Sequence, residues 1–203
     1  REGEEPPRFA FHAAAWQSAN LRACYLSEQW RQDDAAFFEM LASLRRGTPT
    51  VHAHAILASR ATEPDAAHDC PQLYPHNEDV NRINSAKLAA LPGKEEIFIM
   101  ESRGSKAFVE QLKRGCLSPE TLRLKPGARV MFTKNNFGEG FANGTLGEVQ
   151  GFGTEGRPIV RTRDGRTVDV ELMEWDIADG GRTLAKIIQF PLRLAWAMTI
   201  HKS

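Results

Sequence analysis

The chain has 203 residues, of which 41% are hydrophobic and 26% are charged, a composition typical of a globular protein and not of a disordered or fibrous one. Lysine and arginine together number 26, as do aspartate and glutamate, so the net charge by itself predicts no nucleic-acid partner. Three widely spaced cysteines exclude a disulfide framework, and no apolar run reaches the roughly 18 residues of a transmembrane helix; with a polar start unlike a signal peptide, these features predict a cytoplasmic protein without membrane contact.

The first elements along the chain are short. Residues 9–20 predict a helix that buries Phe11 and Trp16, and residues 22–26 alternate in the manner of a strand. From Ala35 to Arg46 the apolar residues recur at helical spacing.

That helix has clear end signals. Asp33 or Asp34 is suited to cap its first turn, and Gly47 follows its last. A further helix is expected after Thr48-Pro49. It carries two histidines two residues apart, which point to different helix faces, so we expect no metal site.

The next stretch predicts alternating strands and helices. Residues 72–75 read as a buried strand end, and His76-Asn77 then begins a helix that Pro92-Gly93 ends. A strand at 97–100 and a helix at 106–114 follow.

From Leu122 the pattern changes to short strands separated by glycine-rich turns. Asp164-Gly165 lies between two alternating runs, which is a strong signal for a two-residue hairpin. Several such strands in about sixty residues predict a small β-barrel inserted into an α/β domain.

Two nucleotide-binding motifs are excluded. The sequence contains no G-x-x-x-x-G-K-[ST] phosphate loop. Residues 151–156 match G-x-G-x-x-G, but a strand and not a helix is predicted after them, so we interpret them as a turn.

The last stretch places hydroxyls, an imidazole and an ammonium close together, at Thr199, His201, Lys202 and Ser203. Such groups donate hydrogen bonds to phosphate oxygens without reading base sequence. The chain stops there without a terminating signal, so we expect it to be a piece of a longer protein.

Three stretches together resemble the Pif/RecD-like ATP-dependent DNA helicases. The first, Phe9-Ala-Phe-His-Ala-Ala-Ala-Trp16 with Leu26-Ser-Glu-Gln-Trp-Arg-Gln-Asp-Asp34, is similar to the motif IV region of the family. The second is Leu73-Tyr-Pro-His-Asn-Glu-Asp-Val-Asn-Arg-Ile-Asn84. The third runs from Leu124-Lys-Pro-Gly-Ala-Arg-Val-Met131 to Leu194-Ala-Trp-Ala-Met-Thr-Ile-His-Lys-Ser203, whose end resembles motif V without the Gln-Gly that normally follows.

The resemblance implies an α/β fold: a partial second RecA-like helicase domain of the P-loop NTPase type, interrupted by an SH3-like β-barrel. Residues 1–121 are expected to form its first part, 122–184 the barrel and 185–203 its truncated continuation. It also implies ATP and Mg²⁺, bound mainly by a first motor domain that precedes residue 1. The partners would be single-stranded DNA and duplex junctions, unwound five-prime to three-prime in DNA repair and recombination. The fragment alone is not expected to hydrolyse ATP.

The resemblance also implies roles for particular residues. Arg31 matches the arginine finger that reaches the γ-phosphate from the opposite domain, and Gln32 is a candidate for nucleotide contact. The alternative for Arg31 is an ordinary surface arginine paired with a neighbouring acid. Thr199, His201, Lys202 and Ser203 match motif V and are expected to hold DNA phosphates, although a buried, hydrogen-bonded histidine is an alternative for His201.

Further DNA-binding candidates come from local pattern. His76 and Asn77 sit at a strand-to-helix junction, where a helix N-terminus binds phosphate or is merely capped. Lys134 and Asn135 lie beside aromatic residues that either receive bases or fill the barrel core. The predicted hairpin adds three further DNA-binding candidates. They either line a DNA channel or lie on a strand face exposed to solvent: Arg161, Arg163 and Arg166.

Two other classes of function stay open from the sequence. The chain is compatible with a non-enzymatic nucleic-acid or protein interaction module that kept a helicase fold. The β insertion is also compatible with binding a protein partner, as SH3-like barrels often do.

Overall fold

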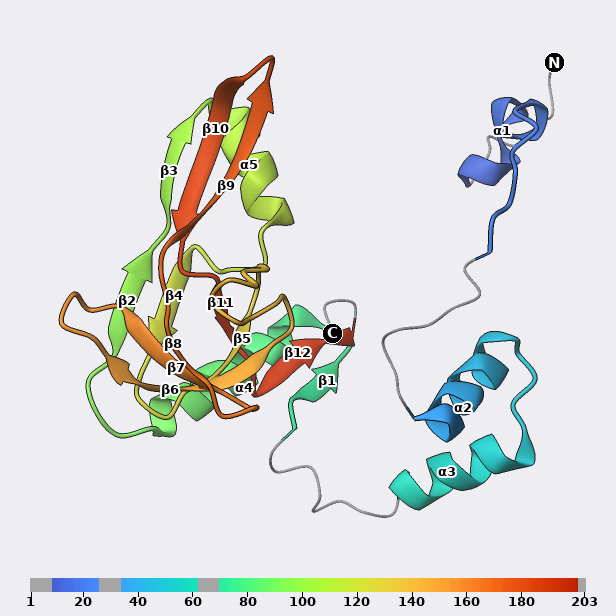
Figure 1. Ribbon diagram of the computed structural model, residues 1–203, viewed down its shortest axis with the longest axis horizontal. Helices are drawn as coiled ribbons and strands as arrows, with labels where there is room; N and C mark the ends of the chain where they lie inside the picture. Colours follow the sequence, from blue (N-terminus) through green and yellow to red (C-terminus); the bar gives the residue numbers. More distant parts are fainter. Residues whose placement is uncertain (1–8, 26–33, 62–69, 201–203) are drawn as a thin grey trace. The chain divides into compact units, whose positions relative to one another are not determined.

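The computed structural model describes residues 9–25, 34–61 and 70–200 (Figure 1). The chain divides into two compact units, Arg1–Pro64 and Asp65–Ser203. None of the helices in the described ranges is long and apolar enough to cross a lipid bilayer.

The first unit is helical. Its elements are the 3₁₀-helix η1 (Ala10–His12) and the helices α1 (Ala14–Ser18), α2 (Ala35–Arg45) and α3 (Val51–Ala61). The Asp34 carboxylate caps α2 by accepting hydrogen bonds from two backbone N–H groups at 3.0 Å, as the sequence predicts. The helix predicted after Thr48-Pro49 is confirmed as α3.

The expectation that Phe11 and Trp16 are buried is wrong for the described residues. Their side chains are 51% and 49% exposed, and η1 and α1 contain no buried residue. Phe11 instead packs locally, with its ring stacked on that of Phe9 at a centroid distance of 5.2 Å. Residues 22–25 form no strand. The apolar spacing of this segment therefore does not correspond to a buried helix face within the described residues.

The second unit begins and ends with one parallel pair of strands. β1 (Gln72–Tyr74) pairs with β12 (Ala197–Thr199), and α4 (Asn77–Ala90) packs on both. This is the α/β part of the fold. The β1 strand itself is not the buried strand end that was predicted, because two of its three residues are exposed.

A buried amide joins α4 to this pair. The side chain of Asn84 donates from Nδ2 to the carbonyl of Ala197 and accepts from its N–H at Oδ1, both at 3.0 Å. The carboxamide of Asn84 therefore satisfies both polar groups of one peptide residue on β12, as a neighbouring strand would.

The remaining strands form three further sheets within the described residues. β2 (Glu96–Ile99) pairs with β4 (Thr121–Leu124), and β3 (Glu101–Gly104), β10 (Arg182–Gln189) and β9 (Met173–Asp179) form a three-stranded sheet. Helix α5 (Lys106–Gly115) packs on the three-stranded sheet. The largest sheet has the order β11-β5-β6-β7-β8 and contains the strands β11 (Leu192–Leu194), β5 (Arg129–Phe132), β6 (Leu146–Phe152), β7 (Pro158–Thr162) and β8 (Thr167–Asp169).

The main hydrophobic core lies against one face of the five-stranded sheet. Phe132, Val149, Val160 and Leu192 are fully buried there, together with Leu122 from β4. The alternation along each strand sends every second residue to the opposite face.

These strands do not close into a barrel within the described residues, so the SH3-like barrel is not confirmed. Two sheets also cross the expected limits of that module. β4 pairs with β2 across residue 122, and β11 pairs with β5 across residue 184. The hairpin predicted at Asp164-Gly165 is confirmed, because it joins β7 to β8.

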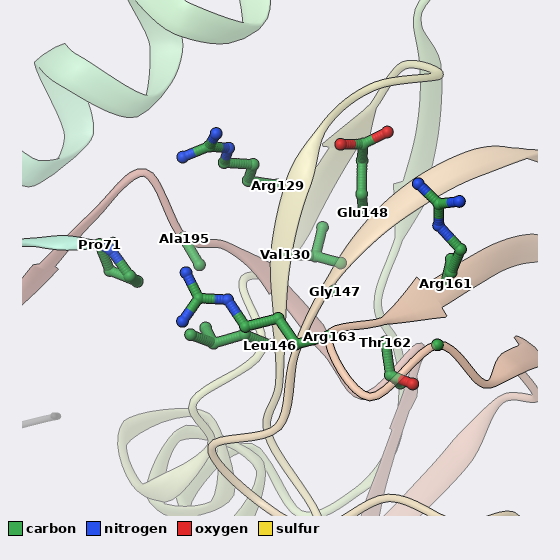
Figure 2. A pocket seen from close by; sticks show the side chains of 11 residues that line it. Pro71, Arg129, Val130, Leu146, Gly147, Glu148, Arg161, Thr162, Arg163 and Ala195 are labelled. Carbon is green, nitrogen blue, oxygen red and sulfur yellow. The ribbon is translucent and has the colours of Figure 1, made fainter. Parts of the chain in front are cut away.

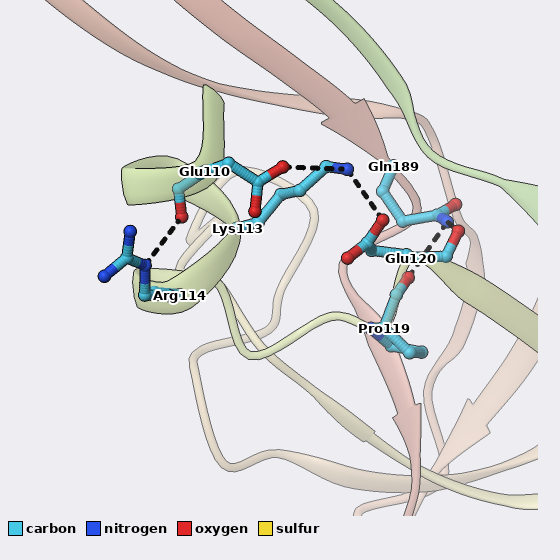
Figure 3. A network of polar contacts seen from close by, with 6 residues as sticks. All are labelled: Glu110, Lys113, Arg114, Pro119, Glu120 and Gln189. Carbon is cyan, nitrogen blue, oxygen red and sulfur yellow. Dashed lines mark hydrogen bonds and ion pairs between the residues drawn. The ribbon is translucent and has the colours of Figure 1, made fainter. Parts of the chain in front are cut away.

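A buried glutamine connects the smaller sheets (Figure 3). The Nε2 atom of Gln189, at the end of β10, donates to the carbonyls of Phe98, Pro119 and Glu120 at 3.2–3.4 Å. Its Oε1 atom accepts from the N–H of Phe190 at 3.0 Å. Nearby, Lys113 of α5 forms an ion pair with the Glu120 side chain at 2.7 Å.

The backbones of β3 and β10 approach each other closely at Gly104, and a substitution there tests how tightly this strand pair is packed. A Cβ atom on Gly104, whose φ is +110°, would lie 2.3 Å from the carbonyl oxygen of Leu184 and 2.6 Å from the Cα of Ala185. We expect Gly104→Ala to lower the free energy of unfolding by on the order of 2–3 kcal/mol, measured by urea denaturation. Gly115→Ala is the control, since its Cβ meets no atom within 4 Å and helical alanine is favoured. Equal stabilities for the two variants would contradict this account.

Candidate nucleic-acid interface

The face of the five-stranded sheet that points away from the core carries a row of charged side chains. Arg129 on β5 lies opposite Glu148 on β6, and Glu148 lies opposite Arg161 on β7. Residues opposite one another in an antiparallel pair lie on the same face. Arg163, whose N–H donates to the carbonyl of Leu146, extends this charged face beyond the end of β7.

These side chains line a depression of about 410 Å³ (Figure 2). Its walls also include Pro71 just before β1 and Ala195 between β11 and β12. Figure 2 shows the carboxylate of Glu148 between Arg129 and Arg161, with Arg163 beside Leu146 and near Ala195. The site is thus formed by three strands of one sheet and by the two segments that lead into the parallel pair.

The charge of the depression is mainly positive, with three arginines against one carboxylate. Arg161 is exposed and forms no ion pair with any described residue, whereas Arg129 and Arg163 are already engaged. Guanidinium groups are planar donors that bind phosphate oxygens in pairs. The depression is therefore suited to an anion with several oxygens.

A glycine lets β6 and β7 approach closely below these arginines. A Cβ on Gly147 would lie 2.6 Å from the Cγ1 of Val160 and 2.8 Å from the carbonyl oxygen of Arg161. Any side chain at this position would push β7 away from β6. The spacing between Glu148 and Arg161 therefore depends on this glycine.

Arg166 is paired with Asp164 inside the β7–β8 turn. Arg166 donates from Nε to the Asp164 carboxylate at 2.7 Å, and the hydroxyl of Thr162 donates to the same carboxylate. The Arg166 bond, and secondarily the Thr162 bond, lower the pKa of Asp164 from 3.8 to about 2. Arg166 is thus neutralised within the turn and does not line the depression, unlike Arg161 and Arg163.

The candidates Lys134 and Asn135 are used within the fold. Lys134 donates to the carbonyl of Glu174, and its ammonium lies 4.8 Å from the centroid of the Trp175 ring. The Oδ1 atom of Asn135 accepts from the N–H of Asn143 at 2.8 Å, which closes their loop. Of the aromatic residues beside them, Phe141 is 4% exposed and belongs to the core, whereas Phe137 is 77% exposed.

Thr199, His76 and Asn77 come together at one edge of the parallel pair. Thr199 lies opposite Tyr74, the last residue of β1, and is buried. His76 is the N-cap residue of α4, without a side-chain capping bond, and Asn77 begins the helix. Ligands of α/β sheets bind outside the carboxyl ends of parallel strands, and this edge is such a place. These three residues stay candidates for phosphate contact.

Five predicted site residues lie outside the described residues: Arg31, Gln32, His201, Lys202 and Ser203. Within the described ranges, no group of histidine, cysteine, aspartate and glutamate is arranged to hold a metal ion.

Sequence reasoning missed Arg129 and Glu148. Each lies on a strand of the β region, but the pairing of β5, β6 and β7 was not predicted residue by residue. Arg129 and Phe132 are three residues apart on one strand, so their side chains point to opposite faces of the sheet.

The comparisons with known proteins agree on one family. The family profile described as "DNA helicase Pif1, 2B domain" matches residues 107–152. The chain is 35% identical over 254 residues to the ATP-dependent DNA helicase Pif1 of Psychrobacter sp., an alignment that covers 97% of this chain and 38% of that protein. It is 36% identical over 214 residues to human ATP-dependent DNA helicase PIF1, covering 100% and 32%. The chain thus spans about a third of the length of these relatives.

Solved structures give the same result. The unliganded Pif1 of Bacteroides sp. superposes with a TM-score of 0.72 and 26% identity, covering 87% of this chain and 42% of that one. The complex of Bacteroides sp. Pif1 with ADP-AlF4 has a TM-score of 0.70 at 26% identity and covers 86% and 41%. Bacteroides Pif1 bound to single-stranded DNA has a TM-score of 0.55, also at 26% identity and covering 86% and 41%.

The ion pair in the β7–β8 turn gives a prediction on pH. Because the pKa of Asp164 is lowered on folding to about 2, its contribution to stability is complete above 3.8 and is lost as pH falls through about 2. We expect Arg166→Ala to return this pKa toward 3.8, measured by carbon-13 NMR titration of the Asp164 carboxyl group. Arg163→Ala is the control. Arg163 is next to Asp164 in the sequence but is not a cause of the lowered pKa. A pKa that stays near 2 in Arg166→Ala would assign the shift to another group.

Proposed function

This chain belongs to the Pif1 helicase family, and from that premise we propose that it is part of an ATP-dependent DNA helicase whose arginine-lined depression holds the backbone of single-stranded DNA. One observation carries this proposal. Arg129 of β5, Arg161 of β7 and Arg163 of the turn after β7 line one depression, with β6 between the two strands.

Phosphate is the group of DNA that this arrangement favours. Contacts to phosphates position a strand without reading its sequence, and arginine supplies them with paired N–H donors. No aromatic side chain lines the depression among the described residues, so base stacking is not part of this contact. The proposed interface therefore grips the backbone and leaves the bases to other parts of the protein.

Two related structures support the choice of partner and cofactor. Bacteroides Pif1 has been solved bound to single-stranded DNA, and Bacteroides sp. Pif1 with ADP-AlF4. We propose that the full-length protein likewise uses ATP, with Mg²⁺, to move five-prime to three-prime along one strand. The edge formed by Thr199, His76 and Asn77 would then contribute further phosphate contacts.

Residues 1–121 and 185–203 would belong to a second RecA-like domain, and residues 122–184 to an SH3-like insertion. In this arrangement Arg31 reaches the γ-phosphate of ATP held mainly by a first motor domain, with Gln32 beside it. A cation at that position stabilises the charge that builds on the transferring oxygens.

The phosphate contacts are tested through their salt dependence. Binding of an oligothymidylate is measured by fluorescence anisotropy at several salt concentrations for the wild type and for the double variant Arg161→Ala/Arg163→Ala. Each phosphate contact to a single strand adds about 0.7 to the slope of log affinity against log salt, so we expect the slope to decrease by about 1.4.

The control removes the same charge elsewhere. Arg103→Ala/Arg114→Ala replaces two arginines that do not line the depression, and we expect it to keep the wild-type slope. If both double variants lose the same slope, the effect is one of net charge and the depression is not the interface.

The arginine finger is tested in the full-length helicase. We expect Arg31→Ala to reduce DNA-stimulated ATP hydrolysis by about 10³-fold or more, because it removes charge stabilisation at the transferred phosphate, while binding to single-stranded DNA is retained. Arg31→Lys should not restore the rate, since an ammonium lacks the forked donors. Arg45→Ala, at the last turn of α2, is the matched control. Hydrolysis by Arg31→Ala within twofold of the wild-type rate would show that Arg31 is an ordinary surface residue.

A further inference from the structure

Arg193 on β11 has buried guanidinium nitrogens without partners. Its Nε and Nη1 atoms are shielded from solvent and form no hydrogen bond with any described residue. Leaving a buried donor of a charged group unsatisfied costs more than leaving a neutral one. A native fold that keeps such a group without a partner has a positive charge available for a ligand.

The side chain lines a second depression, of about 290 Å³. Asn81 and Ser85 of α4 contribute to its wall, as do Thr121 and Arg123 of β4. These side chains supply amide, hydroxyl and guanidinium donors around one cavity. Nη2 is not among the shielded nitrogens of Arg193, and the residue itself lines the cavity.

The charge of this cavity is also positive. No carboxylate lines it within the described residues, and Arg123 forms an ion pair with Glu95 at 3.3 Å outside the lining. Burial lowers the pKa of Arg193, and no acidic group opposes this shift. Because a guanidinium does not lose its proton in proteins, Arg193 stays charged in the cavity.

The walls of the cavity are fixed by buried contacts. Asn84, which lines it, is held by its two hydrogen bonds to Ala197, and Leu122 is fully buried in the main core. Arg193 itself lies opposite Met131 in the β11–β5 pair. A cavity built from paired strands and a clamped helix is largely formed before a ligand enters, which lowers the cost of binding.

We propose that this cavity is a binding site for a phosphate group, held by Arg193 with help from Arg123 and the polar side chains of α4. A tetrahedral phosphate has enough oxygens to use a guanidinium edge together with amide and hydroxyl donors, whereas a carboxylate has two. The phosphate belongs either to a nucleic-acid backbone or to a free phosphate compound.

This site is separate from the arginine-lined depression and does not rest on it. The segment 193–195 contributes to both, with Arg193 and Leu194 in one lining and Ala195 in the other. The two sites share no lining residue. One can therefore fail while the other holds.

The test uses the Nε–Hε NMR signal of Arg193 and the melting temperature, at constant ionic strength set with chloride. Inorganic phosphate is expected to shift the Arg193 signal in a saturable manner and to raise the melting temperature of the wild type. Arg193→Met, which keeps an apolar stem of similar length, should weaken phosphate binding by about tenfold or more, the size expected for a lost charge-assisted contact. Without phosphate this variant should be at least as stable as the wild type, because it removes an unpartnered buried charge.

Matched variants separate phosphate binding at Arg193 from binding elsewhere on the surface and from a purely structural role of this arginine. Arg82→Ala, on an exposed part of α4 outside the lining, should keep the wild-type response to phosphate.

A response retained in Arg193→Met, or an Arg193→Met variant that is strongly destabilised without phosphate, would overturn the proposal and give Arg193 a structural role. A larger shift of the Arg193 signal with oligothymidylate than with inorganic phosphate, at equal phosphate concentration, assigns the ligand to nucleic acid; the reverse assigns it to free phosphate. The variant Arg161→Ala/Arg163→Ala should leave the Arg193 response to inorganic phosphate unchanged.

Discussion

The arrangement of the second unit depends on the buried carboxamide of Gln189. This side chain is 1% exposed, and its nitrogen reaches the carbonyls of Phe98, Pro119 and Glu120 while its oxygen accepts from the next peptide. It therefore ties the end of β10 to the end of β2 and to the segment that enters β4. An apolar residue of the same volume would leave these carbonyls without that donor, which is costly in a core. Because β10 leads directly through Phe190 and Pro191 into β11, this junction also fixes where the five-stranded sheet begins.

The position of β11, which follows this junction, places residues of one short segment at both positive depressions. β11 reaches the five-stranded sheet as an edge strand, so its residues face β4 and α4 on one side and the end of β5 on the other. The alternation of the sheet then separates its core face, with Phe132 and Val149, from the face of Arg129 and Arg161. A neutral chain thus concentrates positive charge in two places, because the strand register, and not the composition, decides which charges are neighbours.

The sequence predicts local features of this structure well and non-local ones poorly. The cap at Asp34 and the hairpin at Asp164-Gly165 involve residues within a few positions of one another, so local patterns were sufficient. The charged row needs the pairing of β5 with β6 and of β6 with β7, which no local pattern specifies. Phe11 shows that a local pattern can also mislead. Apolar spacing predicted a buried side chain, but the spacing does not show whether another element covers it. The buried state of Arg193 depends on α4, about a hundred positions earlier in the sequence.

The hydrogen bonds between Asn84 and Ala197 have a consequence for how the protein is made. The two residues are 113 positions apart, and the strands that they stabilise open and close the second unit. On a ribosome, α4 emerges long before β12, so the Asn84 amide has no strand to bind while the intervening sheets are synthesised. Pairings at such separation close late because the loop entropy must be overcome first. The α/β edge is thus the last part of the unit to become structured, and until then the nascent chain exposes an apolar helix face that invites chaperones or aggregation.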